Sequence, residues 1–168
     1  ADQHEINIGP AAQTGDAVNL TFGQLIDTTI IAQVGIDSLR ATQITNTDSV
    51  LDTLTAPWIG SLFITQGDAN FDMTLSGVGA PNGMTLGSAV ITGNIRDAMW
   101  NITGNIGDLI AGDTTFFSLD VNSNVQNISL GNATNTTLDV SDNITSLAIN
   151  GNFNNGVIIA DQLSSAAI

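Results

Sequence analysis

Apolar and polar residues alternate along most of this chain, in short runs separated by Gly, Asn, Asp and Ser. Leu-Asp-Val at 138–140 and Leu-Ala-Ile at 147–149 show the spacing. A period of two is typical of β-strands with one buried and one exposed face, and the residues between the runs favour tight bends. No window keeps the i, i+3, i+4, i+7 spacing of a helix over three turns. The pattern therefore predicts an all-β chain of short strands.

The runs recur with a period of 19 residues. The segment SDNITSLAING at 141–151 repeats NSNVQNISLGN at 122–132 and TGNIGDLIAGD at 103–113. Six columns of like residues follow from this alignment, which chance similarity of short motifs does not explain. The columns are Trp100, Leu119, Leu138 and Val157; Ile102, Val121, Val140 and Ile159; Asn105, Asn124, Asn143 and Gln162; Ile106, Val125, Ile144 and Leu163; Leu109, Ile128, Leu147 and Ala166; and Ala111, Leu130, Ile149 and Ile168.

A 19-residue unit of short strands and bends matches one turn of a stacked coil. The repeat predicts a single parallel β-solenoid (β-helix) with coils of about 19 residues, stacked at the strand spacing of about 4.8 Å. The coils extend over 31–168 and are regular from about 86. Earlier copies begin at Ile59 and Ile36, with longer loops between them. Residues 1–30 are expected to form an N-terminal cap or an irregular first coil.

The column of Asn105, Asn124, Asn143 and Gln162 predicts an amide ladder. An amide that donates to the amide of the next coil satisfies polar groups at a corner of the solenoid. Outward-facing amides that bind a sugar or an ion are the alternative. The apolar residue that follows each Asn favours the ladder.

Carboxylates also recur at this period. Asp120 and Asp139 share one column, and Asp142 and Asp161 share another. Carboxylates about 5 Å apart repel, and an oxygen-ligated cation such as Ca²⁺ relieves that repulsion. The columns make Ca²⁺ a candidate ligand, with a solvated acidic face as the alternative. No cofactor is required by this fold.

The charge balance excludes several partners. The 168 residues include 16 acidic residues and two basic ones, Arg40 and Arg96, for a formal charge of −14. Nucleic acid is not an expected partner, because phosphate neutralisation needs a basic patch. Anionic lipid headgroups are disfavoured by the same sign of charge. No apolar run approaches the roughly 20 residues of a membrane span, so direct membrane insertion is not expected.

Catalysis has little support in the sequence. His4 is the only histidine, in a terminus expected to be mobile, and Cys is absent. A Ser-His-Asp triad or a zinc site is therefore not expected. Trp58 and Trp100 are the only large platforms for stacking a sugar, and Trp100 falls in an apolar column. The chain is not expected to be an enzyme.

Other features agree with export. The chain begins ADQHE, without an initiator Met or a leader, as a processed secreted protein or an artificially trimmed chain would. We therefore expect an extracellular or cell-surface location. Asn-X-Ser/Thr acceptor sites for glycosylation occur at Asn19, Asn101, Asn127, Asn132, Asn135 and Asn143.

The end of the chain repeats an interior coil. LSSAAI at 163–168 matches ITSLAI at 144–149. A solenoid end without a cap exposes unpaired backbone groups over an apolar face, which is a template for a further chain. A longer solenoid, or an N-terminal segment folded over the edge, are the alternatives. Candidate edge residues are Leu163, Ala166 and Ile168 at one end and Ile6, Ile8, Leu20 and Phe22 at the other.

The tract WNITGNIGDLIAG at 100–112 and its copies resemble the β-strand-repeat or β-helix regions of bacterial and archaeal cell-surface proteins, over roughly 59–168. A more specific likeness is to the proteins of tubular archaeal sheaths. The resemblance implies an extracellular structural protein, and with the open end it predicts self-assembly into a filament, sheath or surface layer. The alternatives are a β-helix that binds or cleaves carbohydrate, with surface glycans as partners, and a fragment of a large repeat adhesin.

Overall fold

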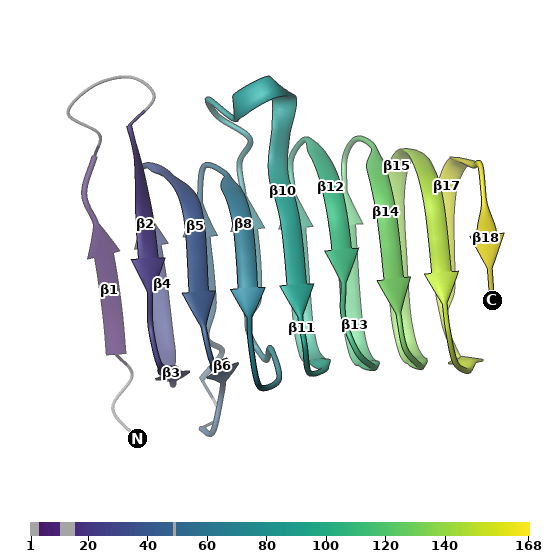
Figure 1. The fold of residues 1–168 in the computed structure, drawn as a ribbon, viewed down its shortest axis with the longest axis horizontal. Coiled ribbons are helices and arrows are strands. Elements are labelled where there is room, and N and C mark those ends of the chain that lie inside the picture. Colours follow the sequence, from purple (N-terminus) through teal and green to yellow (C-terminus); the bar gives the residue numbers. More distant parts are fainter. Residues whose placement is uncertain (1–3, 11–15, 49) are drawn as a thin grey trace.

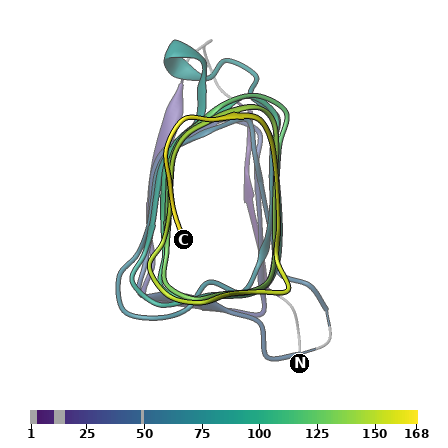
Figure 2. The same ribbon diagram turned by 90° about the vertical axis from the view of Figure 1, so that its right-hand side faces the viewer.

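The chain winds into a β-solenoid of about 8 turns (Figure 1). The computed structural model describes residues 4–10, 16–48 and 50–168. Seen along its axis, the solenoid is a rectangle with two long and two short sides, and the coils superpose on one another (Figure 2). All paired strands are parallel. The prediction of an all-β parallel solenoid with coils of about 19 residues is confirmed.

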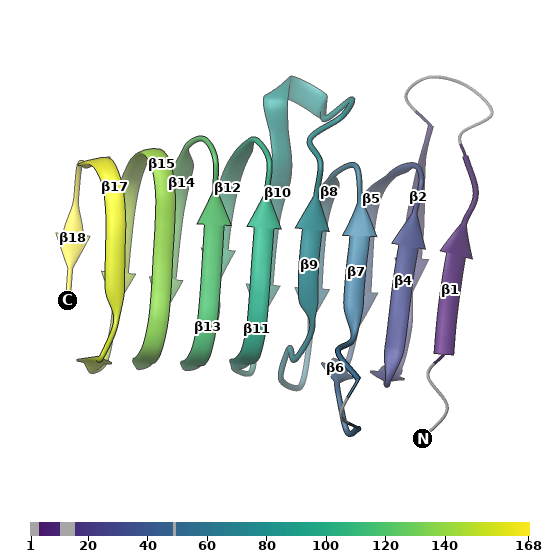
Figure 3. The ribbon, with the colours of Figure 1, turned by 180° about the vertical axis from the view of Figure 1, so that it is seen from behind.

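The strands form two broad faces. The first face, seen in Figure 3, comprises β1 (His4–Ile8), β4 (Thr28–Ala32), β7 (Thr53–Ala56), β9 (Asp72–Leu75), β11 (Ile95–Ile102), β13 (Thr114–Val121) and the start of β15 (Ala133–Ile149). The second face, seen in Figure 1, comprises β2 (Ala17–Thr21), β5 (Gly35–Ala41), β8 (Ile59–Ile64), β10 (Met84–Ile91), β12 (Asn105–Ile110), β14 (Val125–Leu130) and the end of β15. The remaining elements are β3 (Gln24–Ile26), β6 (Gln43–Thr45), the 3₁₀ turn η1 (Pro81–Gly83), β16 (Phe153–Asn154), β17 (Val157–Leu163) and β18 (Ala166–Ala167).

Strand pairing places like residues over one another. Leu119 lies opposite Leu138, and Ile106 lies opposite Val125. The earlier copies are also in register, since Ile59 pairs with Ile36 on one side and with Leu86 on the other. The inward members of each column are buried and form one continuous core. Periodic apolar positions thus become stacks that fill the space between the faces.

The last coil departs from the predicted alignment on the first face. Leu138 pairs with Ile158 rather than Val157, and Val140 pairs with Ala160 rather than Ile159. The interval from Ala133 to its partner Phe153 is 20 residues, one longer than in the preceding coil. A bulge between Val140 and Asn143 restores the 19-residue interval, so Leu163 again pairs as predicted. The register prediction was therefore wrong by one residue over 157–160 and right from Gln162 onward.

Residues 4–10 and 16–30 occupy coil positions. Strand β1 pairs with β4 on the first face, and β2 pairs with β5 on the second. Residues 1–3 and 11–15 of the predicted cap lie outside the described residues. His4 was expected in a mobile terminus, but it begins β1, where backbone pairing with Thr28 orders it.

One deviation from the regular outline is at 76–83, between β9 and β10, where η1 projects beyond the rectangle (Figure 2). The sequence VGAPNG predicts this loop, because Gly and Pro favour tight turns. Among the described residues, no helix is long and apolar enough to cross a membrane.

Candidate functional site

Three of the four predicted ladder amides are linked by hydrogen bonds. The Asn124 side chain donates to Asn105 Oδ1 over 3.2 Å, and the Asn143 side chain donates to Asn124 Oδ1 over 2.9 Å. The backbone N–H groups of Asn124 and Asn143 donate to the same two oxygens. Gln162 pairs in register with Asn143 but is exposed. The three amides are half-buried. Their hydrogen bonds join successive coils at the corner before the second face.

A second ladder, not anticipated from the sequence, runs along the opposite corner. Asp68 Oδ1 accepts the backbone N–H of Asn94 over 2.8 Å, and Asn94 Oδ1 accepts that of Asp113 over 2.8 Å. Asp113 in turn accepts both the backbone and side-chain N–H groups of Asn132, whose Oδ1 accepts those of Asn152. We call these five residues the corner ladder. The corner ladder pairs backbone groups in the turns that lead from the second-face strands into the first-face strands.

The corner ladder predicts a specific response to acid. Hydrogen bonds from Asn132, first from its backbone N–H and then from its side-chain amide, hold the pKa of Asp113 below its ordinary value of 3.8. A carboxyl whose pKa is lower in the folded state stabilises the fold above its unfolded pKa, and this stabilisation is lost as the pH falls through the folded pKa. Asp113→Asn keeps an acceptor but cannot titrate, so its stability should fall less between pH 5 and pH 2.

The measurement is the urea midpoint of both proteins across this pH range. Parallel curves for the natural chain and Asp113→Asn would show that this carboxyl makes no contribution to acid sensitivity.

The carboxylates proposed for Ca²⁺ lie on outer surfaces. Asp120 pairs in register with Asp139 on the first face, and Asn101 lies beside Asp120. Asp142 Oδ2 accepts a hydrogen bond from the Asn124 side chain over 3.4 Å, and Asp161 is exposed on the last coil. Within the described ranges, no three His, Cys, Asp or Glu side chains group closely enough to hold a metal ion. Ca²⁺ binding therefore stays a prediction.

The six glycosylation acceptors differ in how their amides are used. The Nδ2 atoms of Asn127, Asn132 and Asn143 donate to side chains of the preceding coil, and Asn135 Oδ1 accepts from Asn155. Asn19 is exposed on β2, and Asn101 is half-buried on β11. A glycan takes the place of one hydrogen on Nδ2, next to the bonds that Asn127, Asn132 and Asn143 make, and Asn101 and Asn135 are half-buried. The exposed Asn19 is therefore the acceptor that the fold accommodates most easily.

Both ends of the solenoid leave core columns accessible. At the C-terminal end, Leu163 is 40% exposed and Ile168 is 65% exposed, and Ala166 is exposed beside them. At the other end, half-buried apolar residues of β1, β2 and the following turn pack on the core from one side. These residues are Ile6, Ile8, Leu20 and Phe22. The structure thus places all seven predicted edge residues in the first and last coils.

A bend in the first face is built from residues with positive φ. Asp97, Phe116, Asn135 and Asn155 lie over one another in successive coils, with φ between 46° and 50°. Asp and Asn tolerate this left-handed conformation, whereas a bulky residue there is strained by about 1–3 kcal/mol. Phe116 is the exception in this column, and its side chain is 61% exposed. Neither burial of the ring nor backbone preference explains a phenylalanine at this position.

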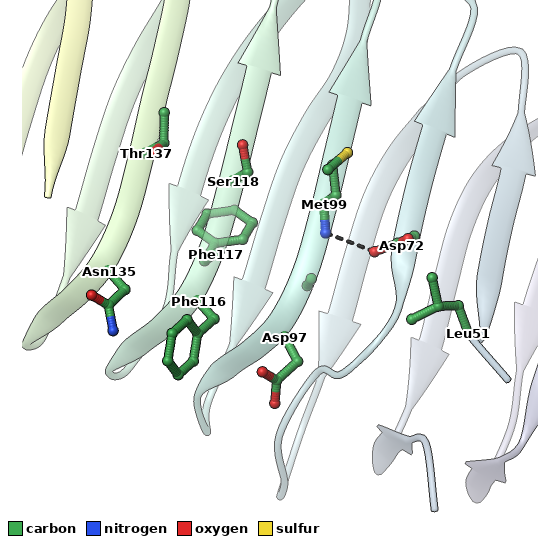
Figure 4. A pocket seen from close by; sticks show the side chains of 10 residues that line it. Leu51, Asp72, Asp97, Met99, Phe116, Phe117, Ser118, Asn135 and Thr137 are labelled. Carbon is green, nitrogen blue, oxygen red and sulfur yellow. Dashed lines mark hydrogen bonds between the residues drawn. The ribbon is translucent and has the colours of Figure 1, made fainter. Parts of the chain in front are cut away.

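Phe116 lies in an open groove of about 390 Å³ on the first face (Figure 4). Exposed apolar side chains of Leu51, Met99 and Phe116 line it together with the carboxylates of Asp72 and Asp97. We call this the Phe116 groove, and its other lining residues are Ala98, Phe117, Ser118, Asn135 and Thr137. Asp72 Oδ1 accepts the backbone N–H of Met99 over 2.7 Å, which fixes that carboxylate beside the apolar side chains. The groove therefore combines exposed apolar side chains with two carboxylates on one outer surface.

The two tryptophans, the only side chains considered as platforms for stacking a sugar, are internal. Trp58 is 6% exposed and Trp100 is fully buried. The carbohydrate-binding alternative calls for an exposed Trp in an acidic groove, and the acidic groove of this structure instead carries Phe116. No signal in the sequence marks this position, because the preceding and following coils have Asp and Asn there.

Comparison with protein-family models, curated proteins and solved structures finds no match to this chain.

Proposed function

We propose that this chain is an extracellular structural protein that self-assembles lengthwise, with the C-terminal coil of one copy stacked on the N-terminal coil of the next. The product is a filament, or a sheath or surface layer built from filaments. One observation carries the proposal: the core columns run the whole length of the solenoid and are still accessible in its first and last coils.

The two ends present the same columns in the same order. Each inward-facing apolar residue of the last coil belongs to a column that starts with an apolar residue of the first coil. The matching pairs are Ile158 with Ile6, Ala160 with Ile8, Leu163 with Val18, Ala166 with Leu20, and Ile168 with Phe22. Stacking would therefore continue the core across the junction, and two of the five pairs combine a small residue with a large one.

The strand edges support the same head-to-tail arrangement of copies. Strands β1 and β2 pair with the next coil on one side, and β17 and β18 pair with β15 on theirs. Their outer edges offer donors and acceptors for a parallel strand. Because the two ends are different surfaces, each junction leaves one end of each type open, and this kind of contact extends into a filament.

The resemblance of the repeats to those of cell-surface and sheath proteins supports this proposal, and a cell-surface location is part of what we propose. The proposal assigns no catalytic role and requires no cofactor, and Ca²⁺ between acidic columns is an optional addition. The partner is a second copy of the chain rather than nucleic acid or a membrane.

Negative-stain electron microscopy and sedimentation velocity of the purified chain, with Ca²⁺ and with a chelator, test the proposal. Ordered filaments, tubes or sheets are expected. Ala166→Lys places a charge in the junction and should reduce the assembled fraction at least tenfold. Ala167→Lys is the matched control, because Ala167 continues the outward position of Ala148.

Monodisperse monomers under every condition would overturn the proposal. Glycan-array binding by such a monomer would then favour the carbohydrate-binding alternative. Coils continuing in the same polypeptide would favour the repeat adhesin.

A further inference from the structure

The Phe116 groove has a counterpart on the opposite face. Arg40, Phe63, Val90 and Ile110 lie over one another in successive coils of the second face. Their neighbours along the strands are buried, so these four side chains point outward. We call them the outer stripe. Ile110 is 44% exposed, and Arg40 is also exposed.

The charges of the two surfaces are complementary. The sequence has two basic residues, and Arg96 pairs with Asp68 over 3.1 Å. Among the described residues, Arg40 forms no ion pair, so it is the cation that the outer stripe can offer. The groove offers the carboxylates of Asp72 and Asp97 beside Met99 and Phe116. The outer stripe thus has a guanidinium at one end of an apolar row, and the Phe116 groove has two carboxylates beside apolar side chains. The two surfaces are complementary in charge and in apolar character.

The two surfaces also lie at the same level of the solenoid. The second-face strands run toward the short side from which the first-face strands start (Figures 1 and 3). Val90 is the last outward-facing residue of β10 before the turn at 92–94, and Asp97 lies just after that turn. Ile110 and Phe116 bracket the next turn in the same way. A second copy moved sideways without rotation would therefore bring its outer stripe against the groove.

The spacing of the residues agrees with this arrangement. The stripe advances one coil per residue, from Arg40 in β5 to Ile110 in β12. The groove also spans successive coils: Asp72 in β9, Met99 in β11 and Ser118 in β13 share one column, and Phe116 lies two residues before Ser118. Both repeats equal the strand spacing of about 4.8 Å. With the two axes parallel, Arg40 facing Asp72 places Phe63 over Met99 and Val90 over Ser118, with the Phe116 ring beside it.

We propose that the Phe116 groove binds the outer stripe of a second copy, joining solenoids side by side. This contact explains a strained, exposed phenylalanine in a column of Asp and Asn, because the ring gains burial only in the pair. It rests on the proposed function in one respect, that copies of the chain associate, and it would connect filaments laterally into a sheet or sheath wall. The contact uses two different surfaces, so it also repeats without closing.

Site-directed cross-linking tests the contact, and the absence of Cys from the sequence makes the test clean. Val90→Cys in one chain and Ser118→Cys in another, both carrying Ala166→Lys to block lengthwise stacking, are mixed with a short bismaleimide. The mixed dimer is expected to form at least tenfold faster than either homodimer. Equal rates for all three dimers, or no cross-linking, would overturn the proposal.

A second variant separates loss of contact from loss of fold. Phe116→Asn restores the residue type that suits the left-handed backbone, so it should raise the Tm while reducing the mixed cross-link at least tenfold. Arg40→Glu should also reduce the cross-link, and Arg40→Lys should retain most of it. If the mixed cross-link forms at the same rate in the Phe116→Asn chains, the proposal is overturned.

The experiments distinguish failure of lengthwise stacking from failure of the lateral contact. Selective cross-linking in the Ala166→Lys chains, with no filaments from the natural chain, would leave the lateral contact and remove lengthwise stacking. Single filaments without selective cross-linking would do the reverse.

Discussion

Replacing Trp100 by alanine is expected to lower the free energy of unfolding by about 3–5 kcal/mol. Trp100 is fully buried in the middle of the solenoid. Its ring lies between Phe71 and Phe117, with ring centroids at 5.7 Å and 5.4 Å, and the contact with Phe117 is edge to face. Its indole N–H donates to the Phe71 carbonyl over 3.1 Å. Truncation removes this contact area and leaves a cavity that the coils on either side cannot fill, because backbone pairing holds them at a set spacing.

Urea unfolding followed by circular dichroism measures this effect, and the fluorescence of Trp58 gives a second probe near the N-terminal coils. Met99→Ala is the matched control, because Met99 is the adjacent residue of the same strand and is 51% exposed. A loss below about 1 kcal/mol for Met99→Ala is expected. Equal losses in the two variants would contradict the assignment of Trp100 to the core.

Gly107→Ala is expected to destabilise the fold by about 1–3 kcal/mol through crowding between coils. A Cβ at Gly107 would lie 2.1 Å from the Gly87 carbonyl oxygen, and a Cβ at Gly87 would lie 2.3 Å from that of Gly60. These glycines occupy one column, and the obstacle is backbone of the preceding coil. A side-chain rotation cannot relieve the clash, so the coils must separate and weaken their hydrogen bonds.

Gly23→Ala provides the control, because a Cβ at Gly23 would meet no atom within 4 Å. It should be neutral or stabilise the fold by up to about 1 kcal/mol, since alanine restricts the unfolded chain. Thermal unfolding of the two variants beside the natural chain gives the comparison. An unchanged Tm for Gly107→Ala would show that the coils yield at this column without cost.

Much of the fold could be predicted because stacking imposes a repeat on the sequence. A side chain such as Leu138 must pack on its counterparts one coil away, so its column keeps one chemical character. The corner ladder was predictable in principle, since Asn94, Asp113, Asn132 and Asn152 each follow a glycine near the same period. The register of β17 was not predictable, because the extra residue before Phe153 and the bulge between Val140 and Asn143 cancel within one coil.

The sequence by itself determined the all-β class, the coil length, the inward columns before the last coil and three members of the amide ladder, because each depends on residues one period apart. Tertiary structure alone decided which outward residues meet across coils of unequal length. It brought Leu51 and Phe116 into one groove although 65 residues separate them, and it placed Arg40 at the end of an apolar row on the other face. The physical reason is that core packing constrains every coil alike, whereas the position of an outer side chain depends on each loop before it.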